Sequence, residues 1–204
     1  MHDRSPDCSS TLPASNQKSL TLSVILIVHN MQRAAPRSVR SLTTPYQRDI
    51  SAENYEVIVV ENGSSRPLDG AEIASLAGNV RYYYLENPPP SPAYAINFGV
   101  DQAAGEILAI MVDGAHMLTP GVLSYGTQPF SFLENPVVVT PPFFLGPSAQ
   151  MESIGKGYDE REEDKLLAGI GWPEDGYRLF DIGVPYRIEP GGVRPQLFLF
   201  VRQF

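Results

Sequence analysis

Three apolar runs constrain the fold of this chain more than any other feature of its sequence. They are Leu22–Val28, Tyr55–Val60 and Ile107–Val112. Short runs of this kind, with few polar residues, are typical of strands that are buried on both faces of a parallel sheet. Segments with helical spacing lie between them. The sequence therefore predicts an α/β fold with a mostly parallel, Rossmann-like sheet flanked by helices.

The same alternation continues outside these runs. Asp69 is expected to cap a helix, and the more polar run Val80–Leu85 is expected to form a strand near an edge of the sheet. Ser91-Pro92 and Thr119-Pro120 each have the residue order that is favoured at a helix start. A short fifth strand is predicted at Val137–Thr140.

The pattern is looser after residue 140, where Pro and Gly become frequent. One charged helix is predicted around Tyr158–Leu167, and a last apolar strand at Gln196–Val201 ends close to the terminus. A chain rarely stops on a strong strand without a covering element. We therefore expect either a truncated chain or a very compact ending.

Composition restricts the class of protein. A chain of 204 residues is long enough for one α/β domain, expected at 19–204 after a disordered tail at 1–18. The net charge of −8 makes a nucleic-acid partner unfavourable. The single Cys8 excludes an internal disulfide and a cysteine-based zinc site. No apolar run approaches a membrane span or a signal peptide, so we expect a soluble cytoplasmic protein. Peripheral association with a membrane stays open.

Polar residues follow each of the three apolar runs. Asn30 follows the first run, Glu61 begins Glu-Asn-Gly-Ser after the second, and the third leads into Asp113-Gly-Ala-His116. The carboxyl ends of parallel strands open on one edge of the sheet, where α/β proteins bind their ligands. We therefore expect Asn30, Glu61 and Asp113 to converge on one ligand. The alternative for each is a residue that only caps a turn.

Motifs of several competing chemistries are absent from the sequence. There is no phosphate-binding G-x-x-x-x-G-K-[ST] motif, no dinucleotide-binding G-x-G-x-x-G after the first strand, and no G-x-S-x-G of the α/β-hydrolases. The three histidines are too scattered for a preformed zinc centre.

The motifs SVILIVHN, YEVIVVENGS and LENPPPSPAYAINFGVDQAAGEILAIMVDGAHMLTPGVL, in this order and spacing, resemble the family-2 glycosyltransferases with the GT-A fold. The resemblance covers Leu20 to about Leu123. It implies a nucleotide-sugar-binding half at 19–140 and a partial acceptor-side half at 141–204. It also implies transfer of a sugar from a nucleotide-sugar donor, usually UDP-linked, to a saccharide or other hydroxyl acceptor with inversion.

The resemblance also implies roles for four donor-site residues. Glu61 stands where the family contacts the base or ribose of the nucleotide, and Asn30 lies in the loop that lines the same pocket. Asn97 matches a helix residue that shapes the donor site, although an interior structural amide is the alternative. Asp113 matches the first Asp of Asp-x-Asp, near the ribose and a divalent cation, Mn²⁺ or Mg²⁺.

The sequence departs from the family pattern at the second Asp, because Ala115 occupies that position. We expect His116 to replace it as a metal ligand, since imidazole suits Mn²⁺ better than Mg²⁺. The alternative for His116 is a solvated loop residue. If the metal is lost, Arg37 or Arg40 could neutralise phosphate instead.

The acceptor side carries a weaker pattern. An inverting transferase needs a general base, and Gly157-Tyr158-Asp159-Glu160 followed by Glu163-Asp164 is similar to the family's acidic motif. Asp164 is the candidate base, with a solvated helix face as the alternative. Trp172 could stack on an acceptor sugar or anchor a core.

Two further functions stay open beside the transferase. The first is a catalytically impaired nucleotide-sugar-binding or scaffold protein, because Asp-x-Asp is altered and the base is weakly marked. The second is a nucleotidyltransferase, although its Gly-rich basic loop is not visible after the first strand.

Overall fold

The computed structural model describes residues 21–112, 114–186 and 198–203. The strands are β1 (Leu22–Val28), β2 (Tyr55–Asn62), β3 (Val80–Leu85), β4 (Ile107–Met111), β5 (Val138–Thr140), β6 (Phe143–Leu145), β7 (Gly183–Pro185) and β8 (Phe198–Arg202). The α-helices are α1 (Ala35–Ser41), α2 (Gly70–Ser75), α3 (Pro92–Gln102), α4 (Val122–Thr127), α5 (Gln150–Gly155), α6 (Glu160–Gly169) and α7 (Leu179–Ile182). The predicted tail at 1–18 lies outside the described residues.

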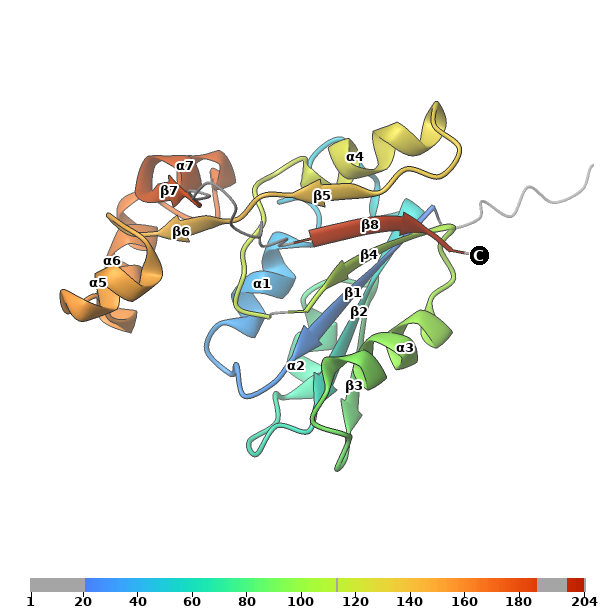
Figure 1. The fold of residues 1–204 in the computed structure, drawn as a ribbon, viewed down its shortest axis with the longest axis horizontal. Helices are drawn as coiled ribbons and strands as arrows, with labels where there is room; N and C mark the ends of the chain where they lie inside the picture. Colours follow the sequence, from blue (N-terminus) through green and yellow to red (C-terminus); the bar gives the residue numbers. More distant parts are fainter. Residues whose placement is uncertain (1–20, 113, 187–197, 204) are drawn as a thin grey trace, which may run out of the picture.

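The central sheet has six strands in the order β3-β2-β1-β4-β8-β5 (Figure 1). The first four are parallel to one another, and β8 is antiparallel to both β4 and β5. The predicted mostly parallel α/β sheet is therefore confirmed. The run at 80–85 lies at the sheet edge, as its polar composition indicates. β8 lies between β4 and β5 and pairs with both.

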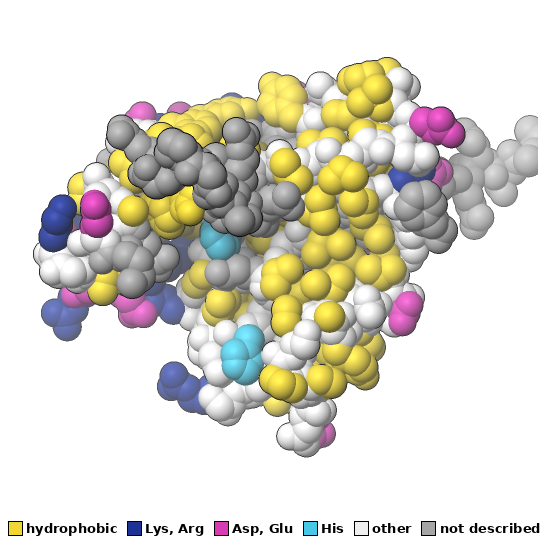
Figure 2. Space-filling model, viewed as in Figure 1, with side chains coloured by type: hydrophobic (Ala, Val, Ile, Leu, Met, Phe, Trp, Pro, Cys, Tyr) yellow, Lys and Arg dark blue, Asp and Glu magenta, His cyan; other side chains and the backbone are white. Residues whose placement is uncertain are grey.

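Helices cover the two faces of this sheet unequally. One face packs on α1, α2 and α4 around a core that includes Val39, Ile73 and Leu123. The other face packs on α3, where Ala95 is buried against Ile25. Figure 1 shows α3 crossing the strands on this second face. Beyond α3, Val139 of β5 is 45% exposed. Figure 2 shows hydrophobic side chains gathered over this part of the molecule.

Helix starts follow local hydrogen bonding. The Asp69 side chain accepts from the backbone N–H groups of Ala71 and Glu72, and Ser91 accepts from that of Ala93, as predicted for N-caps. The helix predicted at Thr119-Pro120 begins later, at Val122. Its N-cap is Gly121, whose φ of 87° is a left-handed conformation that favours glycine, so the chain turns before the helix can start.

Residues 143–185 form a small lobe beside the sheet. β6 and β7 pair as an antiparallel ribbon, and α5, α6 and α7 gather around it in Figure 1. A separate core holds the lobe together, with Leu167, Ile170 and Leu179 buried at its centre. Within the described ranges, no helix is long and apolar enough to cross a membrane.

Candidate functional site

The loops that follow β1 and β2 are joined at the carboxyl edge of the sheet. Val28 lies opposite Glu61 in the parallel register, so the two strands end side by side. The backbone N–H of Asn30 donates to Ser64 Oγ at 2.8 Å, and Asn30 Oδ1 accepts from the backbone N–H of Ser65 at 2.9 Å. A left-handed φ of 53° at Asn30 allows both contacts at once. The structure therefore brings Asn30 beside the loop that Glu61 begins.

Glu61 is a fully buried carboxylate at this edge. Its Oε2 accepts from the backbone N–H of Leu68 at 2.9 Å and from the hydroxyl of Tyr82. Burial and the adjacent Glu61 carboxylate raise the pKa of Tyr82 above its usual range, so the phenol stays protonated as the donor. Oε1 of Glu61 makes no hydrogen bond within the described part of the chain. A buried acceptor without a partner is costly, which singles out this oxygen as one that a ligand could satisfy.

His29 is a part of this edge that the sequence analysis did not single out. Its Nδ1 donates to the carbonyl oxygen of Asn62 at 2.7 Å, and its Nε2 accepts from Asn30 Nδ2 at 3.0 Å. This pair of contacts fits an imidazole that carries its proton on Nδ1. The sequence does place His29 directly before Asn30, at the end of the first apolar run, and this position could have indicated that it belongs to the same edge.

The segment that follows β4 is fastened to α1. Ser38 Oγ donates to the carbonyl oxygen of Gly114 at 2.6 Å, and Ser41 Oγ accepts from the backbone N–H of Leu118 at 3.0 Å. A Cβ at Gly114 would lie 2.7 Å from the Val28 side chain, so glycine permits the close approach. His116 is half-buried between these two anchor points.

The other predicted donor residues are not all brought together. Asp113 lies outside the described residues, so its position at this edge stays a prediction. Asn97 is exposed on α3 rather than interior. Among the residues that the structure describes, no three His, Cys, Asp or Glu side chains gather as a metal site.

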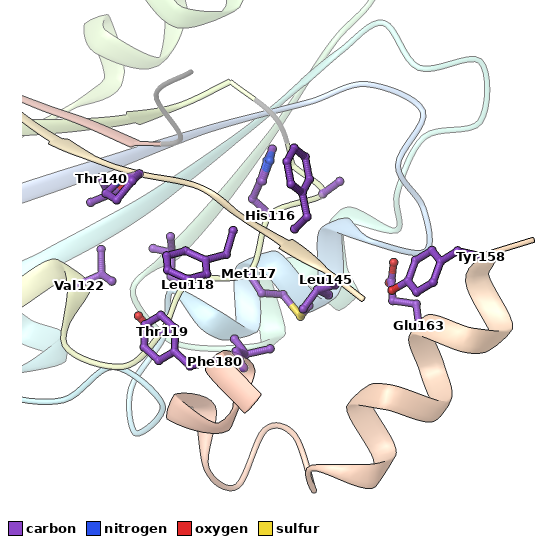
Figure 3. A pocket seen from close by; sticks show the side chains of 15 residues that line it. His116, Met117, Leu118, Thr119, Val122, Thr140, Leu145, Tyr158, Glu163 and Phe180 are labelled. Carbon is purple, nitrogen blue, oxygen red and sulfur yellow. The ribbon is translucent and has the colours of Figure 1, made fainter. Parts of the chain in front are cut away.

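A cavity of about 430 Å³ opens between the segment after β4 and the lobe (Figure 3). Its polar lining includes His116 at one end and Tyr158 with Glu163 at another. The Tyr158 hydroxyl is buried and makes no hydrogen bond within the described chain, and burial raises its pKa. The apolar lining includes Met117, Val122, Phe143, Phe144, Leu145 and Phe180.

Ion pairs join α6 to the loop before α1, through Arg33, and to α1 itself, through Arg37. Arg33 contacts Glu163 at 3.2 Å and Asp164 at 2.6 Å, and Arg37 contacts the same two carboxylates at 2.8 and 3.4 Å. The Arg37 side chain is only 17% exposed. Because it is already paired with α6, Arg37 is committed to this contact in the described structure.

The two acidic residues of this network differ in their surroundings. The Asp164 side chain is 63% exposed, whereas that of Glu163 is 26% exposed and lines the cavity.

Trp172 packs on the lobe core, and its Nε1 donates to Tyr46 Oη at 3.3 Å. This placement fits the core-anchor interpretation of Trp172.

Solved structures share the fold of this chain. The crystal structure of S. aureus TarS 1–349 matches with a TM-score of 0.51 and 22% identity, over 59% of this chain and 35% of that one. The TarS 1–349 complex with UDP-GlcNAc matches with a TM-score of 0.51 and 21% identity, over 59% and 34%. This chain thus spans about a third of the TarS 1–349 chain that it matches. The likeness shows that the α/β sheet is that of the GT-A glycosyltransferases.

A third solved structure aligns over more of the chain. The mannosyltransferase PcManGT from Pyrobaculum calidifontis, in complex with GDP-Man and Mn²⁺, matches with a TM-score of 0.47 and 17% identity, over 91% of this chain and 45% of that one. A comparison with curated proteins gives no significant match.

Family assignment rests on the sequence. The profile described as glycosyl transferase family 2 matches residues 23–141, which is more than half of the chain. The match includes Asn30, Glu61, Asn97, Asp113 and His116. The chain therefore belongs to glycosyl transferase family 2.

Proposed function

We propose that this chain transfers a sugar from a UDP-linked donor to an acceptor hydroxyl with inversion. Family membership and the fold support a sugar-transfer role. TarS has been solved with UDP and with UDP-GlcNAc, which supports a uridine nucleotide in particular. One observation carries the proposal: the unpartnered Oε1 of Glu61 is buried at the sheet edge where α/β proteins bind ligands.

The chemistry of Glu61 fits a nucleotide base. A uracil ring carries one N–H between two carbonyl groups, and a carboxylate oxygen is a strong acceptor for such a donor. The Tyr82 hydroxyl and the Leu68 amide hold the other oxygen, Oε2, so the side chain is oriented before a ligand binds. Asn30 ties the neighbouring loops together and would form the wall of the same pocket.

The proposed diphosphate end of the donor lies toward the segment after β4. Asp113 and His116 would hold a divalent cation there, and an imidazole ligand favours Mn²⁺ over Mg²⁺. When bound, such a cation stabilises the charge that develops on the departing diphosphate. His116 suits this role by position, because its segment is fastened to α1 next to the end of β4. Asn97 is exposed on α3, so in this proposal it would contact the outer part of the donor.

Transfer also needs a group that removes the acceptor proton. The acceptor oxygen bonds to the anomeric carbon, the bond from that carbon to the diphosphate breaks, and the proton passes to a carboxylate. Asp164 was the sequence-based candidate, and Glu163 is its neighbour that lines the cavity. The proposal therefore places residues 19–140 at the donor and 141–204 at the acceptor, with Glu163 favoured over Asp164 as the base.

Calorimetry with UDP tests the donor site. We expect Mn²⁺ to strengthen UDP binding. Glu61→Gln presents an amide in place of the carboxylate and should weaken UDP binding about 10- to 100-fold. Asp113→Ala should make UDP binding independent of Mn²⁺. Glu106→Gln is the matched control, because this exposed residue loses the same charge at the opposite end of β4. Absence of binding to UDP and to any other nucleoside diphosphate would refute the site.

The second candidate function is a catalytically impaired nucleotide-sugar-binding protein, because Ala115 stands in place of the second Asp. Donor hydrolysis, measured on the same sample, distinguishes an enzyme from such a binding protein. We expect hydrolysis of UDP-sugar by the wild-type chain. With an acceptor present, Glu163→Gln should lower transfer more than Asp164→Asn, which removes the other charge of the same ion-pair network. The opposite ranking of the two variants would restore Asp164 as the base.

A further inference from the structure

The cavity beside the lobe has a composition that the donor site does not explain. Its middle is apolar: Met117 and Leu145 lie between the His116 end and the Tyr158–Glu163 end in Figure 3. The aromatic side chains of Phe143 and Phe180, which line the cavity, pack edge to face with their ring centroids 5.2 Å apart. The volume of about 430 Å³ lies within the usual range for pockets that bury a small organic molecule.

This lining suits an apolar group better than a bare saccharide. A sugar carries hydroxyl groups around its whole ring, and each of them loses free energy when it is buried without a hydrogen-bond partner. Between the polar ends, the cavity offers mainly hydrocarbon and aromatic surface. An alkyl chain or an aryl ring gains by burial against such a surface.

The polar side chains of the cavity lie at its two ends, where they could contact the hydroxyl group of a bound molecule. Glu163 projects toward the cavity beside Tyr158, whose buried hydroxyl lacks a partner within the described chain. His116 approaches from the segment that follows β4, on the donor side. A molecule with one polar end and one apolar body matches this distribution.

We propose that the cavity receives the apolar part of the acceptor, so that the acceptor is an alcohol or glycoside that bears an alkyl or aryl group. This inference rests on the proposed function, because the cavity becomes an acceptor site only if the sheet edge binds the donor. It adds the chemical class of the acceptor, which the family and the solved structures leave open.

Trp172 makes binding directly observable. It is the only tryptophan of the chain, and it packs in the same core as Met117 and Leu145, which line the cavity. Octyl β-glucoside below its critical micelle concentration, phenyl β-glucoside and methyl β-glucoside are titrated while the Trp172 emission is followed. We expect saturable binding of the octyl or the phenyl glycoside, at least ten-fold tighter than that of the methyl glycoside.

Two matched variants locate the site. Phe180→Asp places a charge on an exposed lining residue, and Phe132→Asp makes the same change at an exposed phenylalanine outside the cavity lining. We expect Phe180→Asp to weaken octyl or phenyl glycoside binding at least ten-fold and Phe132→Asp to leave it unchanged. Equal binding of all three glycosides, or equal effects of the two variants, would overturn the proposal.

UDP calorimetry on the same proteins keeps the two proposals distinguishable. Normal UDP binding together with no preference for an apolar glycoside refutes the acceptor class alone. Absence of UDP binding refutes the donor site, whatever the glycosides do. Faster transfer of sugar to the octyl or phenyl glycoside than to the methyl glycoside supports both.

Discussion

Removal of the buried Glu56 carboxylate should destabilise the sheet at the edge opposite the candidate site. Glu56 Oε1 accepts from Ser23 Oγ at 2.6 Å and from the backbone N–H of Ala104 at 2.8 Å, and Oε2 accepts from Arg81. These contacts fix the turn between α3 and β4 to β1 and β2. Glu56→Ala would leave a buried hydroxyl and a backbone amide without their acceptor.

The size of the effect follows from these contacts. Each buried donor left without an acceptor costs about 1–3 kcal/mol, and Ser23 Oγ keeps one contact because it also accepts from the Gly105 N–H at 2.9 Å. The Arg81 side chain is 41% exposed, so solvent screening limits its ion pair to at most about 1 kcal/mol. We therefore expect Glu56→Ala to lower the free energy of unfolding by about 3 kcal/mol. Glu56→Gln, which keeps one acceptor oxygen, should lose about half as much.

Urea unfolding followed by far-ultraviolet circular dichroism measures the loss. Glu106→Ala, an exposed glutamate beside the same turn, controls for removal of one negative charge and should change stability by less than about 0.5 kcal/mol. If Glu56→Ala and Glu106→Ala unfold at the same urea concentration, the hydrogen-bond argument is refuted.

Three further perturbations test other parts of the fold. Gly105→Ala would place a Cβ 2.5 Å from the Leu22 backbone, so thermal unfolding should show a loss of about 1–3 kcal/mol or more. Asp69→Ala removes the cap of α2 and should cost about 1 kcal/mol in urea unfolding, with Asp69→Asn as the conservative variant that retains most of it. Burial raises the pKa of Tyr46 from 10.0 to about 12. The unfolded chain therefore loses this proton first, and the contribution of Tyr46 to stability is complete below pH 10 and falls as the pH rises toward 12. In Tyr46→Phe, the decline of unfolding free energy with pH above 10 should be shallower by up to about 1.4 kcal/mol per pH unit, and an unchanged slope would contradict this.

Much of the sheet could be predicted because its strands are locally encoded. The runs at Leu22–Val28 and Val80–Leu85 are bounded by turns, and the structure keeps the same limits. The proximity of Asn30 to the Glu61 loop also followed from the sequence, because parallel strands end at one edge. Thr119-Pro120 misled the prediction of a helix start, because the left-handed Gly121 ends the turn before α4 can begin.

The cavity could not be predicted, because it is assembled across long separations in the chain. Met117, Phe144 and Phe180 come from three segments, and no local pattern relates their positions. The partners of Asp164 are equally non-local: a charged helix indicates a solvated face, and nothing near residue 164 indicates Arg33. The role of His29 depends on the carbonyl orientation of Asn62 across the sheet.

The ion pairs of Arg33 and Arg37 have a mechanical consequence for the molecule. Arg33 links the loop that leaves β1 to α6, the helix that carries Glu163, and Arg37 links α1 to the same helix. A shift of α6 would therefore pull on the same loop that holds Asn30, and an occupied nucleotide pocket would in turn stiffen the wall of the cavity. Because Arg33 and its acidic partners are partly exposed, dissolved salt weakens this tether. Ionic strength should therefore change how strongly the motions of α6 and of the loop that holds Asn30 are coupled.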